Sequence, residues 1–322
     1  MSIKNILASD IGGTNGRFAH FSYDTQSKEL ILVQSIWLPI KSNAESAGEK
    51  FNISGLFNQL NFSIAVDEFD IFSFALASPI IGRKLQFHNS PLVIDLDELE
   101  HRFKGKPIKL LNDFVAQAYA VLSPLGTSYL TIRDGIENSN APLAIMGAGT
   151  GFGKAFIVRV PADIVMASEG GHAAFAPQSK READFAEFVR TRLNVPYAIY
   201  DNTVSGIGLS LLHEFLTGEK LMPQQVAEGF SSGKYEETLT WFAGFYGRAA
   251  RNYTLEILAL GGVFISGGIA IKNPKIITHE AFLANYTDTA IRHNFLKDVP
   301  IKLMNSEDNG LWGAAEFGVR SL

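Results

Sequence analysis

The sequence predicts an α/β protein of two domains. Three observations indicate it: the chain length, the alternation of strand-like and helix-like segments, and the glycine-rich turns that follow three expected strands. A chain of 322 residues, 46% hydrophobic and 19% charged, is longer than one core usually serves and has the composition of an ordinary globular protein. Alternating strands and helices are typical of α/β domains.

The first third of the chain is expected to form a sheet with few helices. Three successive strands joined by tight turns come first, and a buried strand, a short strand and a returning strand follow. Helical spacing occurs over 43–60, and Asp95 is expected to cap a helix over 96–103. The expected strands are 3–9, 17–23, 30–38, 70–77, 85–89 and 107–111.

The remainder repeats the strand–glycine turn–strand arrangement once and then becomes mostly helical. Strands are expected over 143–146, 154–160 and 261–265. The glycine-rich segment 147–153 joins the first two of these, and Gly267–Gly268 follows the third. One helix is expected to begin at 114. Further helices are expected over 181–193, 206–217, 235–258 and 310–320.

Composition and charge exclude several classes of function. The chain has no cysteine, which excludes disulfides, thiolate zinc sites and cysteine nucleophiles. Its formal net charge of −5 argues against nucleic-acid binding and against adhesion to anionic membranes. The longest apolar stretch, 257–265, is too short to span a bilayer, and no signal segment is recognised. We therefore expect a cytoplasmic protein.

The most informative segment is the turn within Asp10–Arg17, which follows the first expected strand. Glycines at 12 and 13 let a ligand approach the backbone closely, and consecutive N–H groups in such a turn form a concave site for phosphate. Because the Asp10 carboxylate would repel a phosphate unless a cation lay between them, the turn predicts a nucleotide site with Mg²⁺. Any one glycine turn alone is more often a simple tight turn.

Two common phosphate-binding motifs are not satisfied by the second glycine-rich turn. A P-loop requires a glycine where this chain has Ala148, and a hydroxyl side chain where it has Ala155. The dinucleotide motif fails because Phe152 occupies the position of its last glycine. A plain Rossmann dehydrogenase is therefore not expected.

Five motifs follow one another along the chain, namely Asp10–Arg17, Leu111–Phe114, Gly147–Gly153, Glu169–His172 and Gly261–Ile269. In order and separation they resemble those of the bacterial glucokinase family, within the superfamily of sugar kinases, actin and heat-shock chaperones. The resemblance covers essentially the whole chain. It implies an actin-like, ribonuclease H-like fold with a small domain of 1–123 plus 305–322, a large domain of 124–304, and an active site in the cleft between them.

The resemblance also implies a reaction: transfer of the γ-phosphoryl of ATP to the 6-hydroxyl of glucose, at the start of glycolysis. Asp113 would then be the base for the sugar hydroxyl, although its position at a helix start also suits an N-cap.

The implied sugar-binding residues are Asn89, Asn112, Asp113, Glu169, His172 and Asp201. The implied ATP-binding residues are Asp10, Gly12, Gly13, Thr14, Asn15, Gly149, Thr150, Gly151, Gly267 and Gly268. Asp10 would hold Mg²⁺ through water. Lys154 is not assigned, because the alternation of its strand could point it into solvent.

Three positions depart from the family pattern. Asp201 stands where the family usually has glutamate, Ala174 where it has aspartate, and Leu92 where it has tryptophan. These differences keep open a kinase for another hexose, or an inactive sugar-binding or regulatory homologue. A regulator with a DNA-binding head is disfavoured, because the first turn begins at Asp10 and no cysteine zinc cluster is present. The oligomeric state is left open, with a homodimer as one alternative.

Overall fold

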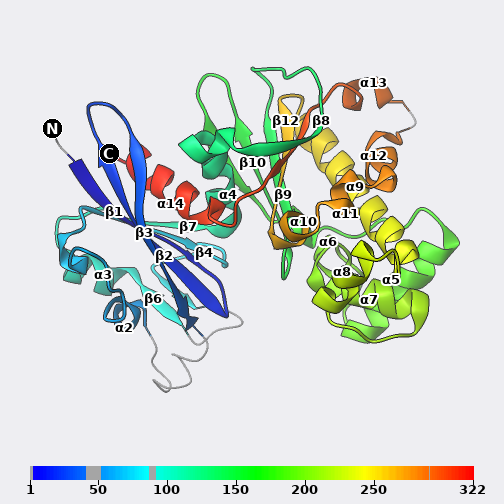
Figure 1. Ribbon diagram of the computed structural model, residues 1–322, viewed down its shortest axis with the longest axis horizontal. Helices are drawn as coiled ribbons and strands as arrows, with labels where there is room; N and C mark the ends of the chain where they lie inside the picture. The colour runs from blue at the N-terminus through cyan, green and yellow to red at the C-terminus, as the bar shows by residue number, and fades with distance from the viewer. Residues whose placement is uncertain (1–2, 41–51, 87–91, 290) are drawn as a thin grey trace. The chain divides into compact units, whose positions relative to one another are not determined.

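The protein is described here from a computed structural model, which describes residues 3–40, 52–86, 92–289 and 291–322. It divides into two compact units (Figure 1). The terminal unit consists of Met1–Thr127 and Asp308–Leu322, and the central unit consists of Ser128–Glu307. The chain therefore leaves the terminal unit once and returns to it with its last segment.

A five-stranded sheet of order β3-β2-β1-β4-β7 forms the terminal unit. Strands β1, β4 and β7 are parallel, and β2 and β3 complete the sheet in antiparallel fashion. Parallel strands end at the same edge, and the register places Ile11 beside Leu76 and Leu76 beside Asn112. The strands are β1 (Ile3–Ile11), β2 (Asn15–Asp24), β3 (Leu30–Pro39), β4 (Ile71–Leu76) and β7 (Ile108–Asn112).

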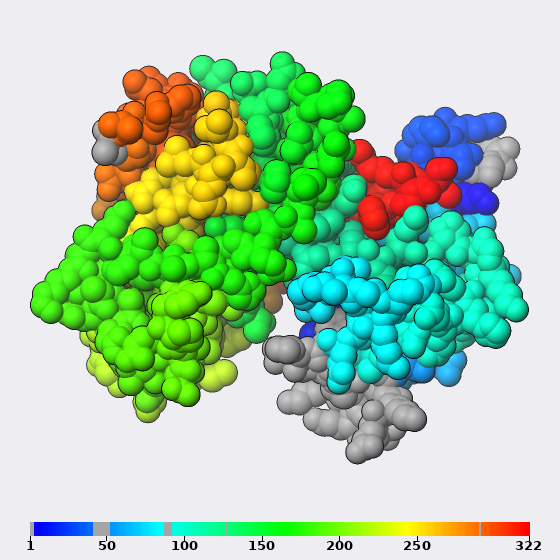
Figure 2. Space-filling model, turned by 180° about the vertical axis from the view of Figure 1, so that it is seen from behind, coloured from blue at the N-terminus to red at the C-terminus, as the bar shows by residue number. Residues whose placement is uncertain are grey.

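Each face of this sheet has its own core, because successive side chains of a strand point to opposite faces. On one face Ile6 and Ala8 pack against α4 (Asp113–Leu122) and α14 (Asn309–Arg320). Figure 1 shows the red α14 along the sheet, and Figure 2 shows it beside the teal segment of α4. Gly313 permits this close packing, since a Cβ there would overlap Ala116 O. The other face is covered by an aromatic-rich core over α2 (Ile53–Phe57), α3 (Leu96–Arg102), β5 (Lys84–Gln86) and β6 (Val93–Asp95).

The central unit is built on a six-stranded sheet of order β11-β10-β9-β12-β13-β8. Its middle strands β9, β12 and β13 are parallel, and β8, β10 and β11 are antiparallel to their neighbours. The strands are β8 (Tyr129–Arg133), β9 (Leu143–Ala148), β10 (Phe152–Val158), β11 (Ile164–Ser168), β12 (Gly262–Ser266) and β13 (Ile301–Met304).

Helix α9 (Glu236–Ile257) is the main core helix of the central unit, with most of its length buried. Helix α12 (Glu280–Thr287) packs along it, where a Cβ on Gly247 would overlap Phe282 O. None of the helices in the described ranges is long and apolar enough to cross a membrane. The remaining helices are α5 (Lys180–Leu193), α6 (Tyr200–Thr203), α7 (Gly206–Thr217), α8 (Pro223–Ser231), α10 (Gly268–Lys272), α11 (Lys275–Thr278) and α13 (His293–Leu296).

Most expected elements are confirmed, with ends that move by one to three residues. Asp95 caps α3 as expected, its side chain accepting from the N–H groups of Asp97 and Glu98. Of the helix expected over 43–60, the structure describes residues 52–60, and Ile53–Phe57 is helical there as α2; 41–51 lies outside the described residues. The strand expected over 85–89 corresponds to β5, which ends at Gln86. Residues 87–91 lie outside the described residues. The sequence prediction missed the strands β6, β8, β11 and β13 and the helices α6, α8, α10, α11, α12 and α13.

Candidate active site

The first glycine turn closes the β1–β2 hairpin beside a partly buried carboxylate. The N–H of Gly12 donates to Asn15 O at 3.0 Å, which fixes the turn, and Asp10 pairs with Arg17 across the two strands. Burial raises the pKa of the Asp10 carboxyl above its ordinary value; the Asp308 carboxylate adds to this, and the Arg17 guanidinium opposes it. A cation bound nearby would therefore stabilise the charged form of this carboxylate.

Two distant parts of the chain complete the surroundings of Asp10. A Cβ on Gly310 would overlap the Asp10 carboxylate, so this carboxylate lies against the first turn of α14, an end of the helix that favours negative charge. Arg17 donates to Asp308 at 3.2 Å and stacks on the Trp37 ring at 3.8 Å. The sequence analysis missed Asp308, because nothing in the local pattern links it to Arg17.

A single carboxylate suits the magnesium that the sequence implies. Among the described residues no group of three or more acidic, histidine or cysteine side chains is placed to hold a metal. Mg²⁺ keeps several waters and is commonly held by one or two carboxylates together with substrate phosphate oxygens. Asp10, next to the predicted phosphate-binding turn, fits that mode of binding.

Asn112 and Asp113 lie where β7 ends and α4 begins. The Asn112 side chain caps α4 by accepting from Phe114 N–H at 2.9 Å and Val115 N–H at 3.4 Å. The interpretation of Asp113 as the N-cap is therefore wrong: Asp113 is the first helical residue, and its Oδ1 also accepts from Phe114 N–H, at 2.9 Å. A carboxylate in a first helical turn is favoured in its charged form.

The structure brings these two segments to one edge of the five-stranded sheet. The register runs from Ile11 through Leu76 to Asn112, so the first glycine turn and the start of α4 follow strands that end in one row. Gly12, Gly13, Thr14 and Asn15 belong to that turn or to the start of β2. Asn89, the remaining predicted sugar residue of this unit, lies outside the described residues.

In the central unit the second glycine turn joins β9 to β10 and is fixed from several sides. Gly149 N–H donates to Gly151 O at 2.8 Å within the turn, and Gly206 N–H at the start of α7 donates to Gly149 O at 2.8 Å. Ala148 N–H donates to Tyr246 OH on α9 at 3.1 Å. Thr150, at the tip, is exposed. The turn is thus rigidly supported while its tip faces outward.

Asp201 also supports this turn. Its Oδ1 accepts from Phe152 N–H at 2.6 Å, and a Cβ on Gly151 would lie 2.5 Å from the same oxygen. One oxygen of a predicted sugar ligand is therefore bound to the backbone of a predicted phosphate turn. This links the two kinds of site residue within the central unit.

The turn after β12 lies against the second glycine turn. Gly267 has a φ of 87°, a left-handed conformation that favours glycine, and a Cβ there would lie 2.5 Å from Ala148 O. A Cβ on Gly147 would lie 2.5 Å from Ser266 O. The predicted ATP-binding residues Gly149–Gly151 and Gly267–Gly268 are thereby brought together.

Glu169 precedes a short 3₁₀ turn (Gly170–His172) that ends at His172 and packs on the start of β10. A Cβ on Gly171 would overlap Phe152 O, so glycine is required for this approach. The two side chains lie 3.2 Å apart, and both are more than 60% exposed. Tyr200 N–H donates to Ala173 O at 3.1 Å, which ties this turn to α6 and hence to Asp201.

Lys154 is the main correction to the sequence analysis. It is only 1% exposed, and its Nζ has no hydrogen-bond acceptor among the described residues. The rings of Tyr253, Tyr200 and Phe152 surround Nζ, with centroids at 4.8, 5.0 and 5.8 Å. Burial lowers the pKa of Lys154, and the Glu256 carboxylate opposes this. The strand alternation could have indicated it, because Lys154 lies on the same face of β10 as the buried Phe152.

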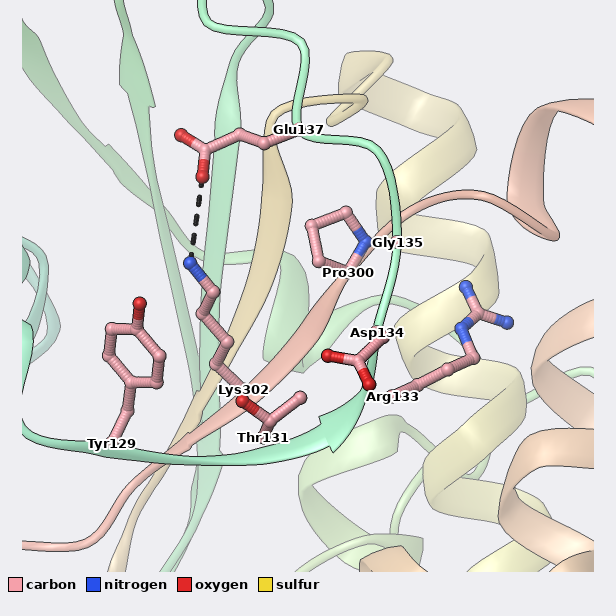
Figure 3. A pocket seen from close by; sticks show the side chains of 8 residues that line it. All are labelled: Tyr129, Thr131, Arg133, Asp134, Gly135, Glu137, Pro300 and Lys302. Atoms are coloured by element: carbon pink, nitrogen blue, oxygen red, sulfur yellow. Dashed lines mark ion pairs between the residues drawn. The ribbon is translucent and has the colours of Figure 1, made fainter.

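A separate pocket of about 180 Å³ lies along β8 and β13 in the central unit (Figure 3). Lys302 crosses it, with its Nζ 3.6 Å from Glu137 and 4.4 Å from the Tyr129 ring centroid. None of the residues that line this pocket is a predicted site residue. Lys302 is thus a second lysine against aromatic rings, remote in sequence from every predicted motif.

Comparison with known proteins shows the family of the chain. A sequence profile of the glucokinase family matches residues 7–320. A glucokinase of Nostoc sp. is 29% identical over 277 residues, covering 77% of this chain and 81% of the relative. The crystal structure of a glucokinase from an Antarctic psychrotroph, 26% identical, superposes with a TM-score of 0.83 over 98% of this chain and 99% of that one. A ROK family glucokinase from Streptomyces griseus, solved in complex with glucose and AMPPNP, is 14% identical to this chain. It superposes with a TM-score of 0.62 over 98% of this chain and 99% of that one. This likeness shows the fold alone.

The fold and these glycine turns define the class of the protein: it is an ATP-dependent sugar kinase of the actin-like, two-domain type. The matched profile spans nearly the whole chain. The protein therefore belongs to the glucokinase family.

Proposed function

We propose that the protein transfers the γ-phosphoryl of ATP to the 6-hydroxyl of glucose, giving glucose 6-phosphate at the start of glycolysis in the cytoplasm. The observation that carries the proposal is the edge of the five-stranded sheet at which the turn after Asp10 and the Asn112–Asp113 segment both lie. A phosphate-binding turn and a carboxylate base at one edge are what transfer to an alcohol requires. Membership of the glucokinase family supports glucose as the acceptor.

Asp113 is the proposed base. It accepts the proton of the sugar hydroxyl as that oxygen attacks the γ-phosphorus. The hydrogen bond from Phe114 N–H fixes its carboxylate, and the first turn of α4 favours the charged form that a base needs. Asn112 uses its side-chain oxygen as the helix cap, so its amide nitrogen is the group that would donate to a sugar hydroxyl.

Glu169, His172 and Asp201 are the proposed sugar ligands of the central unit, together with Asn89 by resemblance alone. Sugars expose many hydroxyls and little apolar surface, so fixed polar side chains must recognise them. The exposed Glu169–His172 pair offers such groups on a turn that backbone contacts hold in place. Asp201 has one oxygen committed to Phe152 N–H, which favours a second candidate, a hexose other than glucose.

ATP is proposed to bind at the three glycine-rich turns. Gly12, Gly13, Thr14 and Asn15 would face the terminal phosphates with Thr150 and Gly151, and Gly267 and Gly268 would border the adenosine. Asp10 would hold Mg²⁺ through water, and the cation when bound neutralises phosphate charge. The rigid support of the second turn is consistent with this role, because donors that are already in place cost no reorganisation.

A coupled assay tests the function. ATP consumption should begin when glucose is added to enzyme with ATP and magnesium, and a panel of hexoses should rank glucose first. Ranking of another hexose first would select the second candidate. Absence of turnover with every common hexose would contradict the kinase proposal.

A further inference from the structure

The starting observation is that Lys154 is a buried cation that does not obtain a hydrogen bond in the described structure. Burying an ammonium group costs free energy unless it is paired, and aromatic rings replace only part of its hydration. A methionine would fill the same space without that cost. Stability of the core therefore does not explain a lysine at this position.

The contacts of Lys154 do suggest a role. Its aromatic neighbours include Phe152, whose N–H binds Asp201, and Tyr200, the residue before Asp201 in α6. On the other side, a Cβ on Gly170 would lie 3.0 Å from Lys154 Cδ and 3.4 Å from its Nζ. Lys154 thus lies directly behind the turn that carries Glu169 and His172.

A further contact completes this arrangement. Lys154 pairs with Ser168 in the β10–β11 register, and Ser168 Oγ accepts from Gly170 N–H at 3.1 Å. From α9, Tyr253 closes the cage at 4.8 Å. The segments that carry Glu169, His172 and Asp201 therefore all meet around one side chain.

We propose that Lys154 is a positioning residue for the sugar site: its ammonium group, held by the aromatic cage, sets the spacing between the Glu169–His172 turn and the Asp201 carboxylate. The proposal rests on the proposed function, because it concerns the same sugar ligands. Lys154 itself is buried and acts through Gly170, Tyr200 and Phe152. It should therefore affect sugar affinity and leave ATP affinity nearly unchanged.

The test is the Lys154→Met variant, which keeps the length and the apolar volume of the side chain and removes the charge. Calorimetry without nucleotide should show a glucose Kd raised about tenfold or more, and kinetics should show the same rise in the KM for glucose. The KM for ATP should stay within about twofold, and the melting temperature should be equal to or higher than that of the wild type. Lys154→Arg, which keeps a cation, should retain more glucose affinity than Lys154→Met.

Lys302→Met is the matched control, because Lys302 also packs on aromatic rings in the same unit but lies in the separate pocket of Figure 3. It should leave the glucose Kd unchanged. Wild-type glucose affinity in Lys154→Met, or an equal effect of Lys302→Met, would overturn the proposal.

Gly170→Ala decides the matter if Lys154→Met does not fold. The added methyl would press on Lys154 Cδ from the exposed turn and should raise the glucose Kd with little change in melting temperature; an unchanged Kd would overturn the proposal. Glucose binding and turnover of the wild type distinguish failure of this proposal from failure of the proposed function. If it neither binds nor phosphorylates glucose, the proposed function fails and this proposal falls with it.

Discussion

Asp10 and Asp113 follow β1 and β7 at the same sheet edge but occupy different environments. Asp10 is partly buried, lies against the first turn of α14, and has a raised pKa that Arg17 only partly opposes. Asp113 lies in a helical first turn, where a backbone N–H holds its carboxylate. The different surroundings suit the two carboxylates to the two proposed tasks, Asp10 next to a cation and Asp113 as the base.

Asp113→Asn keeps the size of the side chain and removes the base. We expect kcat to fall by about 10²–10⁴-fold, the usual contribution of general base catalysis. Glucose binding measured by calorimetry should change by no more than a few-fold. Asp184→Asn, at an exposed ion pair on α5, is the control and should be fully active. Turnover close to the wild type in Asp113→Asn would place the base elsewhere.

Asp10→Asn should raise stability while abolishing activity. Because the folded-state pKa of Asp10 is raised, its ionisation destabilises the folded state, and stability is lost as the pH rises through that raised pKa. The variant should therefore melt higher than the wild type at neutral pH. Below the unfolded-state pKa, near pH 4, both chains are neutral at this position and the difference should vanish. Thermal melts from about pH 3 to pH 8 measure the difference. A difference that does not depend on pH would contradict the prediction.

At the scale of elements, the second glycine turn is held by segments that come later in the chain. The start of α7 binds Gly149 O, α9 supplies Tyr246, and α6 supplies Asp201. A hairpin turn that is tied to three helices cannot relax independently of them. A change in any of these helices should therefore alter the turn that is proposed to bind the phosphates of ATP.

Two substitutions at Asp201 separate its two contacts. Asp201→Asn retains an oxygen that accepts from Phe152 N–H, so the KM for glucose should rise while the KM for ATP stays near the wild-type value. Asp201→Ala leaves that N–H without its partner, at a cost of about 1–3 kcal/mol, so both KM values should rise. Steady-state kinetics with each substrate varied provides the measurement. Equal effects of the two variants on the KM for ATP would show that the hydrogen bond does not support the turn.

Elements with strong local patterns were predictable from the sequence, and contacts between distant segments were not. The buried strand β4 and the Asp95 cap of α3 depend on neighbouring residues, and both are confirmed. The cap of α4 was misassigned by one residue, because Asn112 and Asp113 are both good capping residues and only the backbone conformation separates them. Arg17 and Asp308 are 291 positions apart, and no local pattern links them.

For the whole molecule, the main feature is that the terminal unit is assembled from both ends of the sequence. Helix α14 contributes Leu311, Ala314 and Ala315 to one of its two cores. The sheet alone would expose that face to water. The last segment is therefore part of the fold of the terminal unit and is not an appendage of the central unit.

This assembly can be tested with a shortened chain. Residues 1–127 joined to 308–322 by a flexible Gly/Ser linker should unfold cooperatively on heating, as followed by circular dichroism. Residues 1–127 alone should lack a cooperative transition, because one sheet face then keeps α4 but has lost α14. Equal cooperativity in both would show that α14 is dispensable for this unit.

The split of the terminal unit also sets an order of events during synthesis. The five strands leave the ribosome early, but α14 follows only after the whole central unit has been translated. At roughly 5–20 residues per second, the sheet face that α14 covers waits about 10–40 s for its partner. The central unit, which is continuous in sequence, can fold during that interval, so the part of the chain that is made first is the last to be finished.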